Sequence, residues 1–386
     1  MVIDAKIQDF GDIITGKTPS TSNTSYWGCH YPFITPSDYG FNDRYIYTTD
    51  RQISIQGANS QKKTILPKNS ICITCIGSTI GKICMTVKPS ITNQQINSII
   101  CNENYDSYYV FYLLKYCIPF LQMYGSGTGS GVPIISKNKF GKIKLTAESS
   151  LPLQRRIASI LSAYDNLIEA NSRRIKILEQ MAENLYKEWF VRFRFPNYQN
   201  TPIENGIPKG WKKGQLGDIC EFKRGKNITS GEMIEGAIPV IAAGIEPSGM
   251  HNKSNVSGVS VTMSSSGANA GYIAIHYSDI WAADCSYIDT NSTPYIYFAY
   301  ELLNNMRFVI NNLQRGAAQP HVYAKDVNHL KLLIPNEDLI KVANEQFCKI
   351  HSQINTLQLQ SANLTRQRDL LLPRLMSGQL TPLTNQ

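Results

Sequence analysis

The chain has 386 residues, enough for two or three domains, and its 42% hydrophobic and 10% aromatic content excludes an intrinsically disordered protein. The 38 Lys and Arg residues outnumber the 29 Asp and Glu residues and give a formal net charge of +9. This charge makes a polyanion a reasonable partner, although mild basicity alone is weak evidence. The start MVIDAKIQDFGDI has no long apolar run, and no segment reaches the roughly 18 apolar residues of a membrane span. We therefore expect a cytoplasmic protein without membrane contact.

Residues 1–150 are expected to form a first α+β globule. Short runs rich in Ile, Val, Thr and Tyr are broken by Gly, Pro, Asn and Ser, which is the pattern of strands and turns. A helix is expected late in this part, in DSYYVFYLLKYCIPFLQ. Cys72 and Cys75 have a zinc-like spacing, but no second Cys or His pair accompanies them, so we interpret them as reduced core thiols.

A glycine-rich run, Gly125 to Gly131, resembles a cofactor loop. A dinucleotide or methyl-donor loop would follow a strand, whereas this run follows an expected helix, so we interpret it as a surface loop that can approach phosphates. The sequence contains no phosphate-binding GxxxxGK[ST] motif, no amino-methyltransferase motif and no cluster of metal ligands. We expect a non-catalytic chain with no metal and no cofactor of its own.

A first long helix is predicted over residues 151–195. Apolar residues recur at alternating steps of four and three over more than four heptads, between Pro152 and Pro196. The helix ends in NLYKEWFVRFRFP, where aromatic and basic residues alternate. Two interpretations of this ending stay open: the aromatic residues anchor another protein, or they pack under the neighbouring globule.

Residues 196–334 repeat the first globule, and residues 335–386 repeat the long helix. The clearest matches are Phe10-Gly11-Asp12-Ile13 with Leu216-Gly217-Asp218-Ile219, Gly16-Lys17 with Gly225-Lys226, and Gly77 and Gly81 with Gly267 and Gly271. Such self-similarity indicates a duplicated architecture with diverged surface loops. The expected second helix carries the same seam from Ile340 to Leu375.

Two matching seams in one chain suggest that the two helices pair with each other. We expect an antiparallel coiled coil with pseudo-twofold symmetry, in which the polar seam residues Asn171, Ser361 and Arg368 fix the register. The alternative is that each helix packs separately on its own globule. The predicted fold is therefore α+β, with two similar globules, residues 1–150 and 196–334, alternating with two long helices, residues 151–195 and 335–386; the family resemblance described below implies that the globules are target-recognition domains.

The loops of both globules are rich in basic and neutral polar residues, which are the types that neutralise phosphates and read base edges. Any single one of these residues could equally be a solvated loop residue. The candidate DNA-binding residues of the first globule are Lys17, Arg44, Lys62, Lys63, Ser78, Thr79, Lys82, Gln94, Ser126 and Thr128. Those of the second globule are Lys226, Asn227, His251, Asn252, Lys253, Ser266, Asn269, Arg315, Gln319 and His321.

Several of these motifs together resemble the DNA-specificity subunit of type I restriction–modification systems, over essentially the whole chain. The resemblance rests on GKTPS at residues 16–20, CIGSTIGK at residues 75–82 followed by TNQQIN, the long first helix, and the closing RDLLLPRLMSGQL. The second globule departs from the pattern, since it has NITS and ADCSYI where the first has TPS and NQQIN. The second globule is therefore expected to read a different half-site.

The resemblance implies that each globule reads one half of a split DNA site and that the helices hold the halves near one helical turn apart, about 34 Å. It also implies double-stranded DNA and two adenine-N6 methyltransferase subunits as partners, and leaves open whether a nuclease subunit joins them. S-adenosylmethionine, ATP and Mg²⁺ would then belong to those partners. The candidate partner-binding residues are Trp189, Phe190, Arg192, Phe193, Leu375 and Met376. The main alternative is a non-enzymatic coiled-coil adaptor that binds other proteins; a self-contained methyltransferase or nuclease lacks its motifs.

Overall fold

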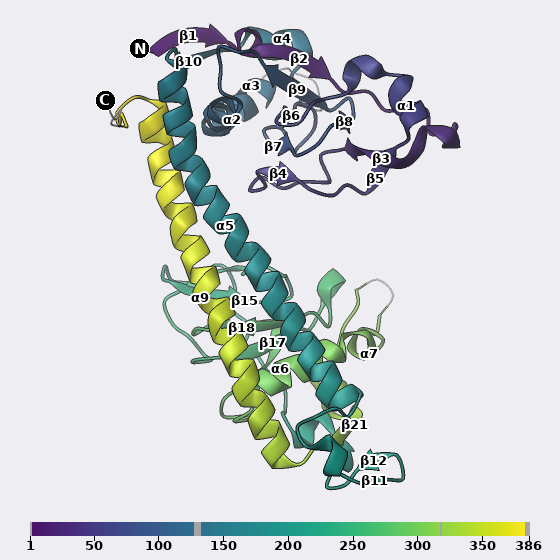
Figure 1. Cartoon of the computed structure of the whole chain (residues 1–386). Coiled ribbons are helices and arrows are strands. Elements are labelled where there is room, and N and C mark those ends of the chain that lie inside the picture. Colours follow the sequence, from purple (N-terminus) through teal and green to yellow (C-terminus); the bar gives the residue numbers. More distant parts are fainter. Residues whose placement is uncertain (1, 127–132, 317–318, 383–386) are drawn as a thin grey trace. The chain divides into compact units, whose positions relative to one another are not determined.

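The computed structural model describes residues 2–126, 133–316 and 319–382 (Figure 1). Internal contacts divide the chain into two units. Unit 1 comprises Met1–Ala170 and Ser361–Gln386, and unit 2 comprises Asn171–Gln360. Each unit therefore contains one globule together with a part of each long helix. No described helix combines the length and apolar character that crossing a membrane requires.

Unit 1 is built on a five-stranded sheet and two smaller sheets. The main sheet has the order β2 (Gly11–Thr15), β9 (Ile96–Cys101), β6 (Ile71–Thr74), β7 (Ile83–Thr86) and β4 (Tyr45–Ile46). A small sheet has the order β5 (Arg51–Ile53), β3 (Trp27–Ile34) and β8 (Ile91–Thr92), and β1 (Val2–Lys6) pairs with β10 (Lys144–Glu148). The short helices are α1 (Ile55–Asn59), α2 (Ser107–Tyr116), α3 (Ile118–Ser126) and α4 (Lys137–Lys142).

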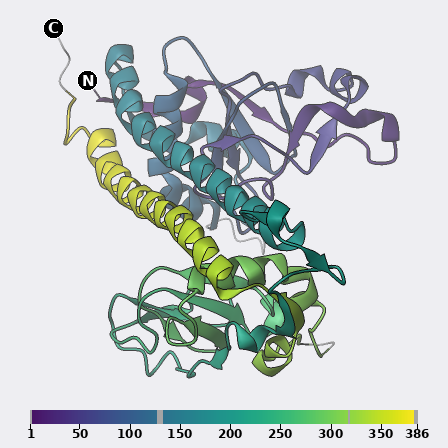
Figure 2. The ribbon, with the colours of Figure 1, turned by 60° about the horizontal axis from the view of Figure 1, so that its bottom comes forward.

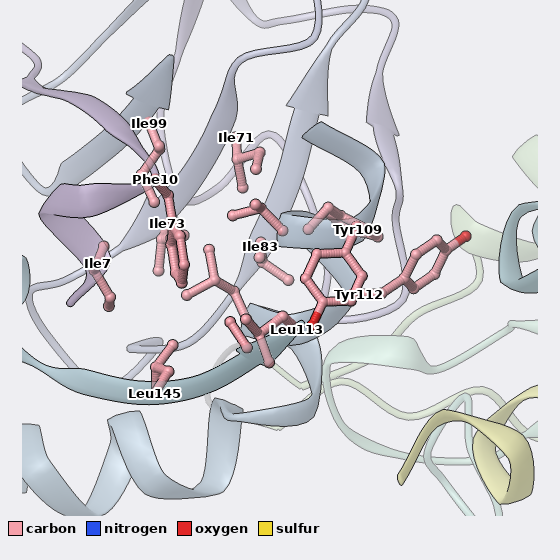
Figure 3. Packing of buried hydrophobic residues seen from close by; sticks show 14 of the residues in the cluster. Ile7, Phe10, Ile71, Ile73, Ile83, Ile99, Tyr109, Tyr112, Leu113 and Leu145 are labelled. Carbon is pink, nitrogen blue, oxygen red and sulfur yellow. The ribbon is translucent and has the colours of Figure 1, made fainter. Parts of the chain in front are cut away.

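The main sheet of unit 1 is covered on both faces, which explains its nearly continuous apolar strands. In β6, Ile71 and Ile73 face the larger core, whereas Cys72 between them faces a second cluster. Figure 3 shows Ile71 and Ile73 on the side of the sheet from which Tyr109 and Leu113 of α2 approach. Alternate residues of a strand point to opposite faces, so each strand contributes to two cores.

Unit 2 repeats most of these elements in the same order, with four strands in its main sheet in place of five. Its main sheet has the order β14 (Lys223–Arg224), β20 (Cys285–Asp289), β17 (Ser260–Ser264) and β18 (Ile273–His276). The small sheet has the order β16 (Gly249–His251), β15 (Ile238–Ile241) and β19 (Trp281–Ala282), and β13 (Lys212–Gln215) pairs with β21 (Lys331–Ile334). The remaining elements are the hairpin β11 (Ile203–Glu204) and β12 (Ile207–Pro208), and helices α6 (Ile296–Asn305), α7 (Arg307–Asn311) and α8 (Ala324–Asn328).

The internal repeat is confirmed in its topology, with one correction to the alignment. Asp9 accepts a hydrogen bond from the Lys6 amide at 2.7 Å, and Asp218 accepts one from the Gln215 amide at 2.8 Å. Each carboxylate caps a short 3-10 turn, which follows β1 in unit 1 and β13 in unit 2. Asp218 therefore corresponds to Asp9 and not to Asp12, because the sequence match followed similar letters three residues away from the capping position.

The two long helices are α5 (Leu151–Tyr186), which continues as a π-helical turn over Lys187–Val191, and α9 (Glu337–Met376). They lie side by side and antiparallel within each unit (Figure 1, Figure 2). In unit 1 the start of α5 shares a core with the end of α9, through residues such as Ile157 and Leu375. In unit 2 the end of α5 shares a core with the start of α9, through residues such as Ala182 and Phe347.

The pairing of the helices is thus confirmed, and one of the predicted polar seam residues takes part in it directly. Arg368 donates a hydrogen bond from Nη1 to Oδ1 of Asp165 at 2.5 Å, and both side chains are buried. Tyr112 of α2 donates its hydroxyl hydrogen to the other oxygen of the same carboxylate at 2.5 Å. This network joins α5, α9 and the globule in unit 1.

Candidate nucleic-acid interface

Three connections of unit 1 meet at one end of the main sheet. The Gly16 amide, directly after β2, donates to the Ile96 carbonyl at 3.1 Å. The Cys75 amide, directly after β6, donates to the Gln95 carbonyl at 2.8 Å. A Cβ atom at position 16 would lie 2.2 Å from a main-chain oxygen, so only glycine allows this close approach. The loop ends are therefore fixed by main-chain bonds and leave the side chains available.

The side chains presented at this end of unit 1 are basic and polar. Lys17 and Ser78 are exposed, and Thr79 is half-buried. Gln94 is exposed, and its Oε1 accepts a hydrogen bond from Thr18 Oγ1 at 2.7 Å. The turn with Ser78 and Thr79 is bracketed by two glycines in the left-handed region, which sets its shape.

Unit 2 repeats two of the main-chain bonds that hold these loops. The Gly225 amide donates to the Cys285 carbonyl at 2.9 Å, as the Gly16 amide does to its own partner strand. The Gly267 amide donates to the Pro320 carbonyl at 2.9 Å, and in unit 1 the Gly77 amide bonds Pro133 at the same distance. The side chains presented there are Lys226, Asn227, Asn269 and Gln319, of which only Asn269 is half-buried and the others are exposed.

Arg315 and His321 flank the Gln319 loop. Their main chains exchange two hydrogen bonds, at 2.9 and 2.8 Å. The Arg315 side chain is 68% exposed although its Nη2 lies 2.9 Å from Oδ2 of Asp326. The His321 ring is half-buried and stacks on Tyr323 with 6.1 Å between ring centroids. Both predicted residues therefore lie beside the gathered loops of unit 2.

Arg44 does not belong to this surface, and its prediction as a DNA-binding residue is wrong. The residue is 5% exposed, and its Nε lies 3.0 Å from Oε1 of Glu169 on α5. Its Nη2 donates to Asn166 Oδ1 at 2.5 Å. Because the pairing of β4 with β7 directs Arg44 toward α5, its charge is used inside the unit.

Two further predictions are contradicted by burial. His251 is 5% exposed, and its Nδ1 accepts a hydrogen bond from the Ile234 amide at 3.0 Å. Ser266 is 6% exposed, and its hydroxyl donates to Oδ2 of Asp284 at 2.8 Å. Lys82 is half-buried and donates from Nζ to the Pro36 carbonyl at 3.0 Å. These polar groups complete the interior of their own units, so His251 and Ser266 are not free to contact DNA.

The remaining predicted residues lie elsewhere or outside the described structure. Lys62 and Lys63 are exposed on a 3-10 turn after α1, and Asn252 and Lys253 are exposed after β16. These positions adjoin the small sheets and not the gathered loops. Ser126 is the last residue of α3, and Thr128 lies outside the described residues.

For the aromatic ending of the first long helix, the second interpretation is confirmed. Phe190 is 9% exposed, with its ring centroid 5.0 Å from that of Phe298. Phe193 meets Trp211 edge-on at 5.2 Å, and Trp189 is partly buried against the same core. Among the four residues predicted here to bind a partner, only Arg192 is largely exposed, and it forms an ion pair with Glu188. These aromatic residues therefore close the core of unit 2.

Leu375 and Met376 are each 3% exposed in the core of unit 1. Their assignment as partner anchors is wrong because the pairing of α9 with α5 covers them.

Two residues of the candidate interface were not predicted from the sequence. Thr18 orients Gln94, and Asp284 is a half-buried carboxylate beside the loops of unit 2. The GKTPS motif contains Thr18 and could have indicated it, whereas nothing in the local pattern distinguishes Asp284.

The described residues offer no metal site: no three or more of their His, Cys, Asp and Glu side chains gather as possible ligands. Cys72 and Cys75 belong to different clusters of unit 1, as expected for core thiols. Burial raises the pKa of the Cys75 thiol to about 12, which disfavours the thiolate that a zinc ion needs. The polar side chains of these loops can bind and orient a ligand through hydrogen bonds and charge.

Known proteins similar to this chain were found by sequence and by structure. The family model described as "Type I restriction modification DNA specificity domain" matches residues 4–180 and 208–362. The type I restriction enzyme MjaIX specificity subunit of Methanocaldococcus jannaschii is 28% identical, over 97% of this chain and 92% of that protein. The HindI specificity subunit of Haemophilus influenzae is 36% identical, over 46% of this chain and 39% of that protein.

The fold has a solved counterpart in the S subunit of a type I restriction–modification system from M. genitalium. That structure covers 100% of this chain and 97% of its own, with a TM-score of 0.65 and 18% identity, so the likeness concerns the fold alone. The family match extends over both repeats and over part of each long helix. With two matched regions that span most of its length, the chain belongs to the family of type I restriction–modification DNA specificity domains.

Proposed function

We propose that the chain reads a bipartite, asymmetric DNA target as the specificity subunit of a type I restriction–modification complex. One observation carries the proposal: both units hold corresponding loops at the same end of the main sheet through two matching main-chain bonds, one at Gly16 or Gly225 and one at Gly77 or Gly267. The side chains that these loops present differ between the units. An equal scaffold with unequal side chains fits two half-sites of different sequence.

The chemistry of the presented side chains supports a division of roles. Lys17 and Lys226 are exposed and can neutralise phosphates, which gives affinity without sequence information. Carboxamide groups, such as those of Gln94 and Asn227, can form two hydrogen bonds with the edge of adenine in the major groove. Gln94 is already oriented by Thr18, so part of its conformational freedom is lost before DNA binds.

The proposal assigns catalysis to other subunits. Methyltransferase subunits with S-adenosylmethionine would flip and methylate one adenine in each half-site, and ATP and Mg²⁺ would serve a nuclease subunit. The named relatives come from prokaryotes, which favours action on prokaryotic DNA in the cytoplasm.

The test is genome-wide adenine methylation in the host, measured by single-molecule sequencing. Deletion of the gene should remove one bipartite motif. Gln94→Ala should change or relax one half of the motif, and Asn227→Ala should change only the other half. If every motif survives the deletion, the specificity assignment fails and the alternative of a protein-binding adaptor moves ahead.

A second measurement separates phosphate contact from base reading. With the purified chain and its methyltransferase subunits, Lys17→Ala should weaken binding to all duplexes and make the slope of log affinity against log salt shallower by about 0.9. Lys88→Ala is the matched control, because Lys88 is exposed at the opposite end of β7. Equal effects of the two variants would contradict the location of the interface.

A further inference from the structure

The main sheets of the two units differ at one edge. In unit 1, β4 forms hydrogen bonds along the outer edge of β7: Tyr45 pairs in parallel with Met85, and the Met85 amide donates to the Arg44 carbonyl at 2.7 Å. In unit 2 the corresponding strand, β18, is the last of its sheet, with no described strand on its outer side. The reason is a shorter connection, since residues 35–50 join β3 to β5 whereas only residues 242–248 join β15 to β16.

The outer edge of β18 presents main-chain hydrogen-bonding groups. Ser264 donates its amide hydrogen to the Tyr272 carbonyl at 2.9 Å, which makes these two residues a hydrogen-bonded pair. Bonded pairs alternate along an antiparallel ladder, so Ala274 and His276 direct their main-chain groups to β17. Ile275 therefore turns its N–H and C=O outward, as Met85 does toward β4.

This edge borders a cavity of about 590 Å³, which lies within the usual range for binding pockets. The lining is shared between β18, with Tyr272 to Ile275, and four helices of unit 2, since Arg307 of α7 also contributes. Side chains from α5, α6 and α9 line the other side, including Glu179, Tyr300 and His351. An unpaired edge strand next to an open cavity has room for one more strand.

Unit 1 indicates which chemistry such a strand would need. On β4, Arg44 lies over the Tyr45 ring, 4.5 Å from its centroid, and pairs with Glu169 of α5. In unit 2, α5 contributes two carboxylates to the cavity, Glu179 and Glu183. Glu183 already pairs with Lys187, so Glu179 is the better acceptor for an incoming arginine.

We propose that the outer edge of β18 takes an extended segment of a partner protein, in which an arginine precedes an aromatic residue. The segment runs parallel to β18, as β4 runs beside β7. Main-chain bonds to Ile275 supply affinity, and the arginine against Glu179 supplies selectivity. The DNA-reading loops adjoin β18 at Gly271, next to Tyr272 of the cavity lining, whereas Ile275 lies three residues further along the strand.

The probe is a fluorescent peptide with the sequence NDRYIYTT, which is residues 42–49 of unit 1, titrated with the full-length chain. We expect saturable binding that Ile275→Pro weakens at least ten-fold, because proline removes the outward N–H. Ile275→Val keeps this donor and should bind as the wild type does. Hydrogen exchange in residues 272–277 should slow when the peptide is present, and exchange in residues 83–86 should not change.

A charge exchange keeps the test decisive if the proline variant fails to fold. Glu179→Lys should weaken binding of this peptide and favour a peptide with glutamate in place of arginine. Three results would overturn the proposal: a Kd weaker than about 1 mM for the wild type, equal binding by Ile275→Pro that has kept its fold, or protection at residues 83–86. Self-association of the chain that Ile275→Pro abolishes would also overturn it, in favour of a second copy as the occupant.

Discussion

The buried ion pair between Asp165 and Arg368 offers a sharp test of how the two long helices are held together in unit 1. The two side chains are 5% and 6% exposed. Asp165→Leu removes the acceptor of both Arg368 and the Tyr112 hydroxyl. The Arg368 guanidinium then retains its ion pair with Asp369, a half-exposed carboxylate on the same helix.

The expected loss follows from an uncompensated buried charge. Breaking a buried pair by removing one partner costs about 3–5 kcal/mol. In a unit of about 150–250 residues each kcal/mol lowers the melting temperature by about 2–4 °C, so unit 1 should melt roughly 6–20 °C lower. The double variant Asp165→Leu with Arg368→Met buries no charge and should recover most of this loss, since replacing a whole buried pair with apolar residues is often neutral or stabilising.

The assay is scanning calorimetry of the full chain, in which we follow the transition of unit 1. Asp369→Asn is the control, and its effect should stay below about 1 kcal/mol because this carboxylate is half-exposed. A double variant as unstable as Asp165→Leu alone would refute the reasoning, because the loss would then come from packing and not from the stranded charge.

Three further predictions concern single residues. Burial lowers the pKa of His276 from 6.5 to about 4, so as the pH falls His276 is protonated in the unfolded chain before it is protonated in the folded chain. The free energy of unfolding should therefore fall by up to about 1.4 kcal/mol per pH unit between about pH 6.5 and 4. In acid titrations, His276→Gln should remove this dependence. Gly16→Ala should abolish reading of one half-site in methylation sequencing, because the added Cβ atom would lie 2.2 Å from a main-chain oxygen. Gly231→Ala is the control and should leave both half-sites intact, because no atom lies within 4 Å of the Cβ position there. Phe190→Ala should destabilise unit 2 by about 3–5 kcal/mol in chemical denaturation, and the exposed Arg192→Ala by less than about 1 kcal/mol; equal effects would contradict the core assignment of Phe190.

The duplicated fold and the paired helices were predictable because their signals are long and repeated. The seam of the first helix extends over more than four heptads, and only a pairing partner explains so narrow an apolar stripe. The glycine matches at Gly77 and Gly267 were equally informative, since both residues adopt positive φ at the same turn. A helix-pairing seam or a positive-φ glycine that occurs in both halves of the chain can therefore be recognised from the sequence alone.

The site residues were less predictable because a loop residue's type does not reveal its burial. Arg44 and Lys17 are both basic residues outside the main apolar runs, yet one is an interior ion-pair partner and the other is exposed. The difference arises from β4, a two-residue strand too short to be recognised by periodicity. The aromatic ending of the first helix was ambiguous for the same reason, since Phe190 could have faced a partner or the core of its own unit.

The two units show how one fold can serve two recognition tasks. In each, main-chain bonds at a glycine hold the loop ends, at Gly16 in unit 1 and at Gly225 in unit 2. In unit 2 the Trp281 side chain also takes part, because its Nε1 donates to the Lys226 carbonyl at 2.8 Å. The exposed side chains of Gln94 and Asn227 form none of these loop-end bonds, so they can change without loss of the fold. Exchanging Gln94 for Asn should therefore alter the bases accepted in one half-site while the melting temperature of the chain stays unchanged. A loss of stability in that variant would mean that the reading residues also carry the loops, and that recognition and folding are not separable in this chain.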